Sequence, residues 1–303
     1  MRRLTGPGPR GFAPRVSARP ELSIIIPWKD RPELGITLRR NRRVFVANGY
    51  EVLVVSCGGA PKPFRELLSA HRFPGLRGVE LPDTMFNKGL ALNIGASLAQ
   101  AERLFFLDAD IVLRGDFLGE SMKRLGTKYF LTVDRVFESE KPETERSSYL
   151  RELSYAMSFV DNKGRTAHVE TNHLNLRDGS RSGPGMVLLR RKHFEAVNGM
   201  NSDLFGWGWE DLDLLVRLQL ELGLSQRKHG NIVHLSHGDD RRDLGGESRG
   251  ISEHRNLARC LENYQRGHYW GTRVDDVQTW EGRAVRVEPE PRKRGGKPLT
   301  PAA

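Results

Sequence analysis

Short apolar runs alternate with amphipathic stretches along the first 135 residues of this 303-residue chain. The runs are rich in β-branched and aliphatic residues and predict buried strands at 22–27, 51–56, 103–107 and 129–133. Apolar residues at helical spacing predict helices at about 33–47, 62–70, 88–100 and 116–125. Because strands alternate with helices, we predict an α/β fold with a mainly parallel central sheet flanked by helices.

The pattern is less regular after residue 135. We expect helices at 149–160, 210–223 and 251–265 and strands at 186–189 and 232–235. The polar, glycine-containing stretch 161–185 predicts a long loop or a short hairpin. No stretch of linker composition separates the two halves, so we predict a single domain over 21–270 that divides at about residue 135.

Polar clusters follow three of the predicted strands. They are Pro27-Trp28-Lys29-Asp30-Arg31, Ser56-Cys57-Gly58 and Asp108-Ala109-Asp110. In an open α/β sheet, ligands bind beyond the carboxyl ends of the strands. The sequence therefore predicts a binding site along this edge of the sheet.

The Asp108-Ala109-Asp110 cluster has the composition of a divalent-cation site. Side chains two residues apart leave a strand on the same side, so both carboxylates would face one ion. Hard oxygen ligands suit Mg²⁺ or Mn²⁺, and such an ion can bridge a diphosphate. The alternative is an ordinary surface turn, which the hydrophobic strand before Asp108 disfavours.

Two tryptophans separated by glycine precede an acidic helix start in the segment 205–213. Trp207 and Trp209 offer flat faces for sugar rings, and the glycines let a ligand approach closely. Asp211 is then placed to accept a proton from an acceptor hydroxyl. The alternative is a capping cluster, in which the acids complement the helix dipole and the tryptophans are buried.

Two histidines near a predicted strand end are candidate metal ligands. His234 and His237 fall on different faces unless the chain turns between them, and one of them could complete a metal shell. The alternative is one histidine in the core and one in a loop.

Basic residues near the same sheet edge are candidate phosphate contacts. Lys29 and Arg31 follow the first strand, where Trp28 or the backbone could face a base. Lys88 begins a predicted helix, and a cation there opposes the helix dipole unless an anion is bound. Lys88 is therefore a candidate phosphate contact, and the alternative is an ordinary solvated lysine.

Charge changes this picture little, although the formal net charge is +10. Residues 1–20 carry five arginines and no acid, and residues 283–303 carry six basic residues and two glutamates. Both segments are rich in Gly, Pro and Arg, so we predict disordered basic tails at 1–20 and 283–303. This distribution disfavours a specific nucleic-acid site, while the tails could contact acidic membrane lipid.

Composition also gives an expectation for the compartment. No apolar run approaches the roughly 20 residues that cross a bilayer, and no apolar segment follows the basic N-terminus. The two cysteines, Cys57 and Cys260, lie outside any CxxC pattern. We expect a cytoplasmic protein that could be peripheral at the inner membrane.

Four segments together resemble a GT-A fold glycosyltransferase of family 2. They are 23–31, 86–95, 108–110 and 205–213. The second half is also similar to the galactosyltransferase-type domain shared by β-1,4-galactosyltransferases and chondroitin polymerases. The resemblance covers about residues 22–243. It implies a Rossmann-like GT-A domain in which about 21–135 binds the nucleotide and 136–270 binds the acceptor.

The resemblance implies a role for each matching residue. Those that match the nucleotide-sugar site are Pro27, Trp28, Lys29, Arg31, Lys88, Asp108, Gly185 and Trp207. Asp110 matches the direct metal ligand and Asp108 the acid near ribose and metal. His237 is the better match to a late metal-binding histidine, and His234 is the fallback.

The acceptor side is implied in the same way. Glu210 and Asp211 match an acidic pair in which Asp211 is the catalytic base, and Trp207 matches the tryptophan that lines the acceptor and donor sugars. Trp209 stands where galactosyltransferases have a small glycine, although tryptophan is common there in GalNAc-transferring enzymes. We assign Trp209 to the acceptor site with Trp207 and Asp211.

The resemblance implies an inverting single displacement with a UDP-sugar donor, Mn²⁺ or Mg²⁺ as cofactor and a carbohydrate or other hydroxyl acceptor. The absence of a secretory anchor and of disulfide cysteines suggests a cytosolic, bacterial-type enzyme of polysaccharide biosynthesis. A nucleotidyltransferase is an alternative, but no Gly-rich phosphate loop follows the first strand. A non-catalytic carbohydrate-binding protein is another, but it needs no paired acids at a strand end.

Overall fold

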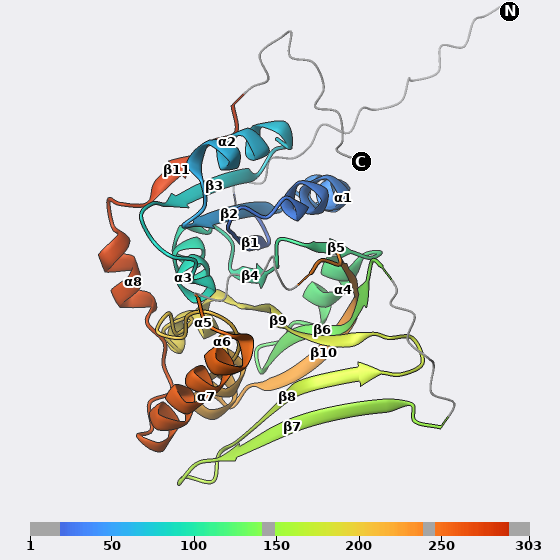
Figure 1. Cartoon of the computed structure of the whole chain (residues 1–303), viewed down its shortest axis with the longest axis vertical. Coiled ribbons are helices and arrows are strands. Elements are labelled where there is room, and N and C mark those ends of the chain that lie inside the picture. The colour runs from blue at the N-terminus through green and yellow to red at the C-terminus, as the bar shows by residue number, and fades with distance from the viewer. Residues whose placement is uncertain (1–18, 141–148, 239–245, 291–303) are drawn as a thin grey trace, which may run out of the picture.

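The computed structural model describes residues 19–140, 149–238 and 246–290. Within these ranges, eleven strands form one mixed sheet with helices packed on both faces (Figure 1). The strand order is β11-β3-β2-β1-β4-β9-β6-β10-β5, and β8 and β7 continue the sheet from β9. This architecture confirms the expected α/β class.

The strands are β1 (Ser23–Trp28), β2 (Glu51–Cys57), β3 (Leu76–Leu81), β4 (Arg103–Phe106), β5 (Ile111–Leu113), β6 (Tyr129–Glu138), β7 (Glu152–Val160), β8 (Thr166–Asn175), β9 (Arg181–Arg190), β10 (Ser225–His234) and β11 (Val285–Val287). The helices are α1 (Glu33–Ala47), α2 (Pro61–Ala70), α3 (Lys88–Leu98), α4 (Phe117–Arg124), α5 (Arg191–Ala196), α6 (Glu210–Leu222), α7 (Arg249–Gln265) and α8 (Arg273–Trp280).

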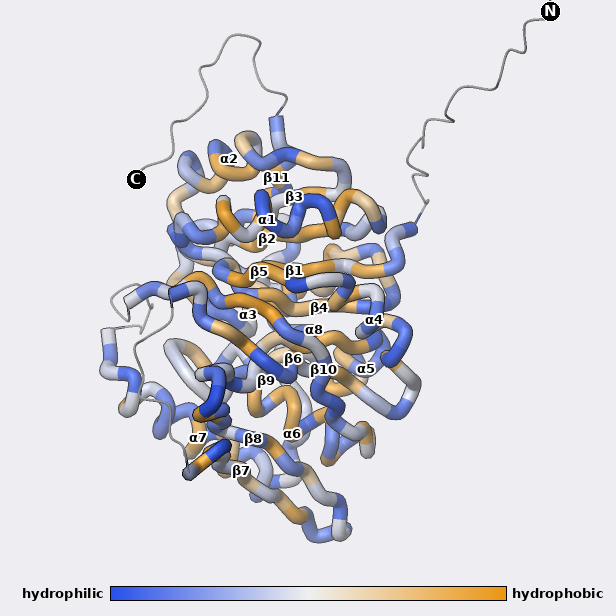
Figure 2. The backbone as a smooth tube through the Cα atoms, turned by 90° about the vertical axis from the view of Figure 1, so that its right-hand side faces the viewer, coloured by the Kyte–Doolittle hydropathy of each residue, from blue (hydrophilic) through white to orange (hydrophobic). Residues whose placement is uncertain are grey.

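The first half of the sheet is the parallel set β3-β2-β1-β4. All six residues of β1 are buried, because α1 and α2 cover one face of the sheet and α3 covers the other. Ile24 and Ile26 pack into the first of these two cores and Ile25 into the second. Burial on both faces explains why these strands appear as continuous apolar runs (Figure 2).

The second half of the sheet is mixed, so the prediction of a mainly parallel sheet holds only for the first half. β9 runs antiparallel to both β4 and β6, and β10 is parallel to β6 but antiparallel to β5. β9 is also antiparallel to β8, and here the cause is local, because only residues 176–180 separate the two strands. A connection that short returns the chain antiparallel, whereas a parallel strand needs a long crossover.

The helix predicted at 149–160 is wrong. Residues 152–160 form β7, which pairs antiparallel with β8 in a long hairpin at the bottom of Figure 1. Of the two alternatives for 161–185, the hairpin is confirmed. β8 lies within that stretch, and β9 begins in it.

Part of the predicted C-terminal tail is ordered. β11 lies inside the segment 283–303 and pairs antiparallel with β3 at the sheet edge. The rest of that tail beyond residue 290, and residues 1–18 of the N-terminal tail, lie outside the described residues. In the described ranges, no helix is both long and apolar enough to cross a membrane.

Candidate functional site

The loop after β4 carries Asp108 and Asp110, and α1 holds this loop in place. The buried Thr37 hydroxyl donates to the carbonyl of Ala109 at 2.8 Å. The Asn41 amide donates to the carbonyl of Ile111 at 2.8 Å and accepts from the backbone N–H of Leu113 at 2.9 Å. Polar groups of one helix therefore fix the chain on both sides of Asp110.

The two carboxylates of this loop point to different partners, which corrects the expectation that they face one ion. β4 ends at Phe106, so the strand alternation no longer governs residues 108–110. Asp108 lies 3.0 Å from the Lys88 ammonium, whereas Asp110 lies 2.9 Å from the Arg31 guanidinium. Asp108 therefore faces Lys88 in this structure, and the contact with a metal that the resemblance implies for it stays a prediction.

A cluster that could hold a metal consists of Asp110, His234 and His237, whose ligand atoms lie within 4.8 Å of one another. Nε2 of His234 is 3.5 Å and Nε2 of His237 is 3.3 Å from the same Asp110 oxygen. The chain turns after β10, so the structure brings together both histidines between which the sequence could not choose. One carboxylate and two imidazoles form a donor set suited to a divalent transition metal.

The hydrogen bonds of the two histidines fit the role of metal ligands. Nδ1 of His234 lies 2.6 Å from a Glu138 oxygen, and Nδ1 of His237 lies 2.8 Å from the carbonyl of Gly238. When each Nδ1–H donates to these acceptors, each Nε2 is left to face Asp110. Metal-binding histidines are oriented in this way by a carboxylate or carbonyl behind the ring.

Electrostatics at this cluster favour charged groups. Although burial opposes it, hydrogen bonds with Asp110 and Glu138 raise the pKa of His234 to about 9. Burial alone would raise the pKa of Glu138, but the hydrogen bond and the charge of His234 lower it to about 2. His234, Arg31 and His237 together also lower the pKa of the buried Asp110. Without a metal, both carboxylates are therefore ionised, and His234 must lose its Nε2 proton before that nitrogen can bind a cation.

Lys88 joins Asp108 to Asp211. Its ammonium lies 2.7 Å from Asp211 and 3.0 Å from Asp108, and it begins α3 as predicted. Burial would lower the pKa of Lys88, but the two carboxylates raise it well above its usual value. Burial raises the pKa of Asp211, with Lys88 opposing the shift. The acids from two distant segments therefore share one partly buried cation.

Gly185 on β9 lies against this ion pair. A Cβ atom at residue 185 would fall 2.3 Å from the Asp211 carboxylate and 3.1 Å from the Lys88 ammonium. A glycine here lets the side chains of Asp211 and Lys88 pack against the strand. The backbone contact to a donor that the resemblance implies for Gly185 stays a prediction.

The start of α6 explains how Glu210 and Asp211 are positioned. Gly206, Gly208 and Trp209 all have left-handed backbones, with φ of 82°, 95° and 70°. The chain turns sharply before the helix, which has three acids in its first turn. Burial and then repulsion from Asp211 raise the pKa of Glu210 to about 7. One Glu210 oxygen is buried with no hydrogen-bond partner among the described residues.

The tryptophans have different environments. Trp209 is 5% exposed, packs with Leu204 and Cys260, and meets Phe159 edge to face, so little of its ring is open to an acceptor and its acceptor role stays a prediction. Trp207 is partly exposed, and the guanidinium of Arg249 lies 3.8 Å from the centre of its ring. Trp207 therefore remains the candidate for sugar contacts, while the alternative of a buried ring applies to Trp209.

The segment after β1 is only partly available to a ligand. Trp28 is buried and stacks on Phe64 at 5.1 Å, so only its backbone could face a base. Pro27 is also buried, whereas Lys29 is partly exposed. Arg31 contacts both Asp110 and Glu33, at 2.9 Å and 3.2 Å.

Three contributors were missed in the sequence. Thr37 and Asn41 are polar residues four apart on the buried side of α1, and this spacing was their only signal. Glu138 ends β6 and supports His234, but in the sequence it lies in a run of ordinary charged residues. Such partners are recognised only once the strands are paired.

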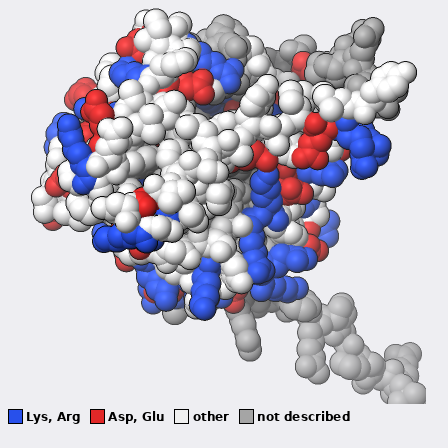
Figure 3. Space-filling view, turned by 90° about the horizontal axis from the view of Figure 1, so that it is seen from below, with Lys and Arg blue, Asp and Glu red and all other residues white. Residues whose placement is uncertain are grey.

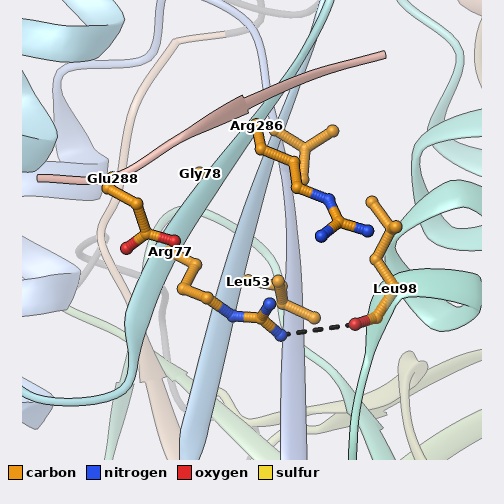
Figure 4. A pocket seen from close by; sticks show the side chains of 7 residues that line it. Leu53, Arg77, Gly78, Leu98, Arg286 and Glu288 are labelled. Atoms are coloured by element: carbon orange, nitrogen blue, oxygen red, sulfur yellow. Dashed lines mark hydrogen bonds between the residues drawn. The ribbon is translucent and has the colours of Figure 1, made fainter. Parts of the chain in front are cut away.

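Another hollow lies away from these residues, where β11 joins β3 (Figure 4). It is lined by Leu53, Arg77, Gly78, Val79, Leu98, Arg286 and Glu288. Arg77 donates to the carbonyl of Leu98 at 3.3 Å across it. None of the predicted site residues lines this hollow, which is a seam between the sheet edge and α3.

Comparison with known proteins agrees with the sequence motifs. A family model described as the N-terminal domain of galactosyltransferase matches residues 165–238. β-1,4-Galactosyltransferase 7 of Drosophila melanogaster is 42% identical over 48 residues, which are 16% of this chain and 15% of that protein. The chain therefore matches only a small part of the length of this relative.

Two solved structures are similar to this chain. One is the mannosyltransferase PcManGT from Pyrobaculum calidifontis in complex with GDP-Man and Mn²⁺, with 13% identity, a TM-score of 0.49, and coverage of 91% of this chain and 79% of that one. The other is S. aureus TarS 1-349 in complex with UDP-GlcNAc, with 11% identity, a TM-score of 0.48, and coverage of 75% and 61%.

The first half of the chain and β9 carry the widest match. Residues 23–197 match the family model described as Glycosyl transferase family 2. This range contains β1 to β9, the carboxylates after β4, and Lys88. It is also more than half of the 303 residues. The chain is therefore a glycosyltransferase and belongs to glycosyl transferase family 2.

Proposed function

We propose that this glycosyltransferase moves a sugar from a UDP-sugar to an acceptor hydroxyl, with inversion, in a reaction that depends on Mn²⁺. The observation that carries the proposal is a convergence at the end of β4. Asp110 meets His234 and His237 there, and Asp108 is linked through Lys88 to Asp211. The residues that would hold the cation and the partly buried Asp211 carboxylate are thus linked through the short segment from Asp108 to Asp110.

Asp211 has the properties of a general base. Its carboxylate is partly buried at the helix start, and burial raises its pKa towards the range useful for accepting a proton. Asp211 accepts the proton of the acceptor hydroxyl as that oxygen forms its bond to the anomeric carbon. The bond from this carbon to the diphosphate breaks on the opposite side, which inverts the configuration.

The leaving diphosphate needs positive charge. Asp110, His234 and His237 would hold the divalent cation, which when bound supplies Lewis-acid stabilisation of the leaving group. The mixed nitrogen and oxygen donors favour Mn²⁺ over Mg²⁺, which prefers oxygen ligands and water. Lys88 and Arg31 lie beside these carboxylates and are the proposed cationic contacts of the phosphates.

Calorimetric titration with UDP, with Mn²⁺ present or removed by EDTA, tests this assignment. Wild-type protein should bind UDP only with the metal, and Asp110→Ala and His237→Ala should lose that metal-dependent binding. Arg40→Ala, on the exposed side of α1, is a control that should bind normally. Equal UDP affinity with and without Mn²⁺ would refute the metal role, and transfer from GDP-sugars alone would refute the donor assignment.

A further inference from the structure

β7 is an edge strand with an open side. It pairs only with β8 among the described residues, and seven of its nine residues are exposed. The one irregularity in this ladder is an extra residue on β8, Thr171, so β7 itself keeps a regular alternation. β7 contains no Lys, Arg or Pro, which are the usual protection of an exposed edge.

Two apolar side chains near the start of β7 are unusually exposed. Leu153 is 42% exposed and Tyr155 is 59% exposed. They lie on the same face as Met157 and Phe159, which pack against the small core around Trp209. The apolar face of β7 is therefore covered at Met157 and Phe159 but exposed at Leu153 and Tyr155.

The pattern of apolar and serine residues in β7 is symmetric about Ala156. From Leu153 to Phe159 it reads apolar, Ser, apolar, Ala, apolar, Ser, apolar. If two copies paired antiparallel about a two-fold axis at Ala156, Ser154 would lie opposite Ser158 and Tyr155 opposite Met157. Leu153 would lie opposite Phe159, so each exposed apolar residue would gain a half-buried apolar neighbour.

The neighbouring registers can be compared in the same way. An axis at Ala156 places Glu152 opposite Val160 at the ends of the strand. Moving the axis to Tyr155 would place Arg151 opposite Phe159, and moving it to Met157 would place Ser154 opposite Val160. Of these three axes, the one at Ala156 places two serines opposite each other and the exposed Leu153 and Tyr155 opposite half-buried apolar residues.

We infer that the chain forms a two-fold symmetric dimer through antiparallel pairing of β7 with β7 of a second copy. The pairing uses the open side of both strands and leaves neither available, so the assembly closes at two chains. Figure 3, viewed from the side where β7 and α7 lie, shows a broad area with few charged side chains beside a row of Lys and Arg.

Residue 156 gives a direct test, because the axis places it opposite itself. In sedimentation velocity the wild-type chain should have twice the 34.3 kDa mass of one chain. Ala156→Lys and Ala156→Glu should each be monomeric, since like charges would meet at the axis. Ala156 is exposed, so neither change disturbs the core.

Mixing the two variants provides the decisive arm. An equimolar mixture of Ala156→Lys and Ala156→Glu should recover the dimer, because opposite charges then meet at the axis. Ala47→Lys, an exposed position on α1, is the matched control and should remain dimeric. A monomeric wild type, a dimeric Ala156→Lys variant, or a mixture that stays monomeric would each overturn the proposal.

Discussion

At the scale of single residues, the site depends on close approach between groups from distant segments. Lys88, Asp108 and Asp211 come from α3, the loop after β4 and α6, and the Lys88 ammonium lies within 3.0 Å of both carboxylates. The identities of the carboxylates and the lysine could be predicted from motifs. Their shared ion pair could not, because it depends on how three elements pack.

Replacing Asp211 by Asn removes the proposed base and keeps the size of the side chain. We expect the transfer rate to fall by about 10²- to 10⁴-fold, while Mn²⁺-dependent UDP binding is retained. Steady-state kinetics with a UDP-sugar and calorimetry with UDP measure the two effects separately. A variant that retains near-normal turnover would remove Asp211 from this role.

Gly185→Ala places a methyl group where the Asp211 carboxylate lies, at 2.3 Å. The carboxylate must move, and a displacement of this size lowers the turnover number by about 10²-fold. Gly250→Ala is a matched control, since the added methyl meets nothing within 4 Å. Comparable turnover in both variants would show that the position of Asp211 tolerates such a shift.

The raised pKa of Glu210 predicts that the free energy of unfolding depends on pH. The folded chain raises its pKa from 4.5 to about 7, so folding favours the protonated acid. This contribution is complete below pH 4.5 and is lost as the pH rises through about 7. Urea unfolding in EDTA should therefore show a steeper loss of stability over this interval in wild type than in Glu210→Gln. Identical pH profiles would contradict the shift.

At the scale of elements, the sequence predicted the parallel half of the fold better than the mixed half. Strands such as β1 are buried on both faces and appear as unbroken apolar runs. In 149–160, apolar residues fit helical spacing and strand alternation equally well, and pairing with β8 decided the outcome. β3 and β11 are short strands whose apolar residues are interrupted by Gly or Arg, so they gave no clear pattern.

The support that α1 gives to the Asp110 loop can be tested at Asn41. Asn41→Ala leaves the carbonyl of Ile111 and the N–H of Leu113 without this partner. We expect a loss of about 2 kcal/mol in the free energy of unfolding and weaker Mn²⁺-dependent UDP binding. Urea denaturation and calorimetry measure these effects, with Arg40→Ala on the exposed face as control. Unchanged UDP affinity in Asn41→Ala would show that α1 does not support the proposed metal site.

At the scale of the whole molecule, basic charge is concentrated near both ends of the chain. Residues 1–18 and 291–303 together carry eight basic residues and no acid. Each Lys or Arg near an anionic lipid surface contributes about 1 kcal/mol. The contact with acidic lipid stays a prediction, and eight such residues would together give binding strong enough to detect.

The full chain should co-sediment with vesicles that contain phosphatidylserine and not with phosphatidylcholine vesicles. Salt should release it, because screening weakens contacts between exposed charges. A chain without residues 1–18 and 291–303 should stay in solution under the same conditions. Binding that survives this deletion would place the lipid contact elsewhere.

The boundary of the folded unit has a practical consequence for anyone who shortens this protein. The Asn93 amide, on the helix that begins with Lys88, donates to Asp276 on α8 at 2.7 Å. Cutting at residue 270, the predicted end of the domain, would remove α8 and β11 together. It would remove a hydrogen-bond partner of the helix that begins with Lys88 and uncover the edge of β3. Expression fragments should therefore extend through residue 290.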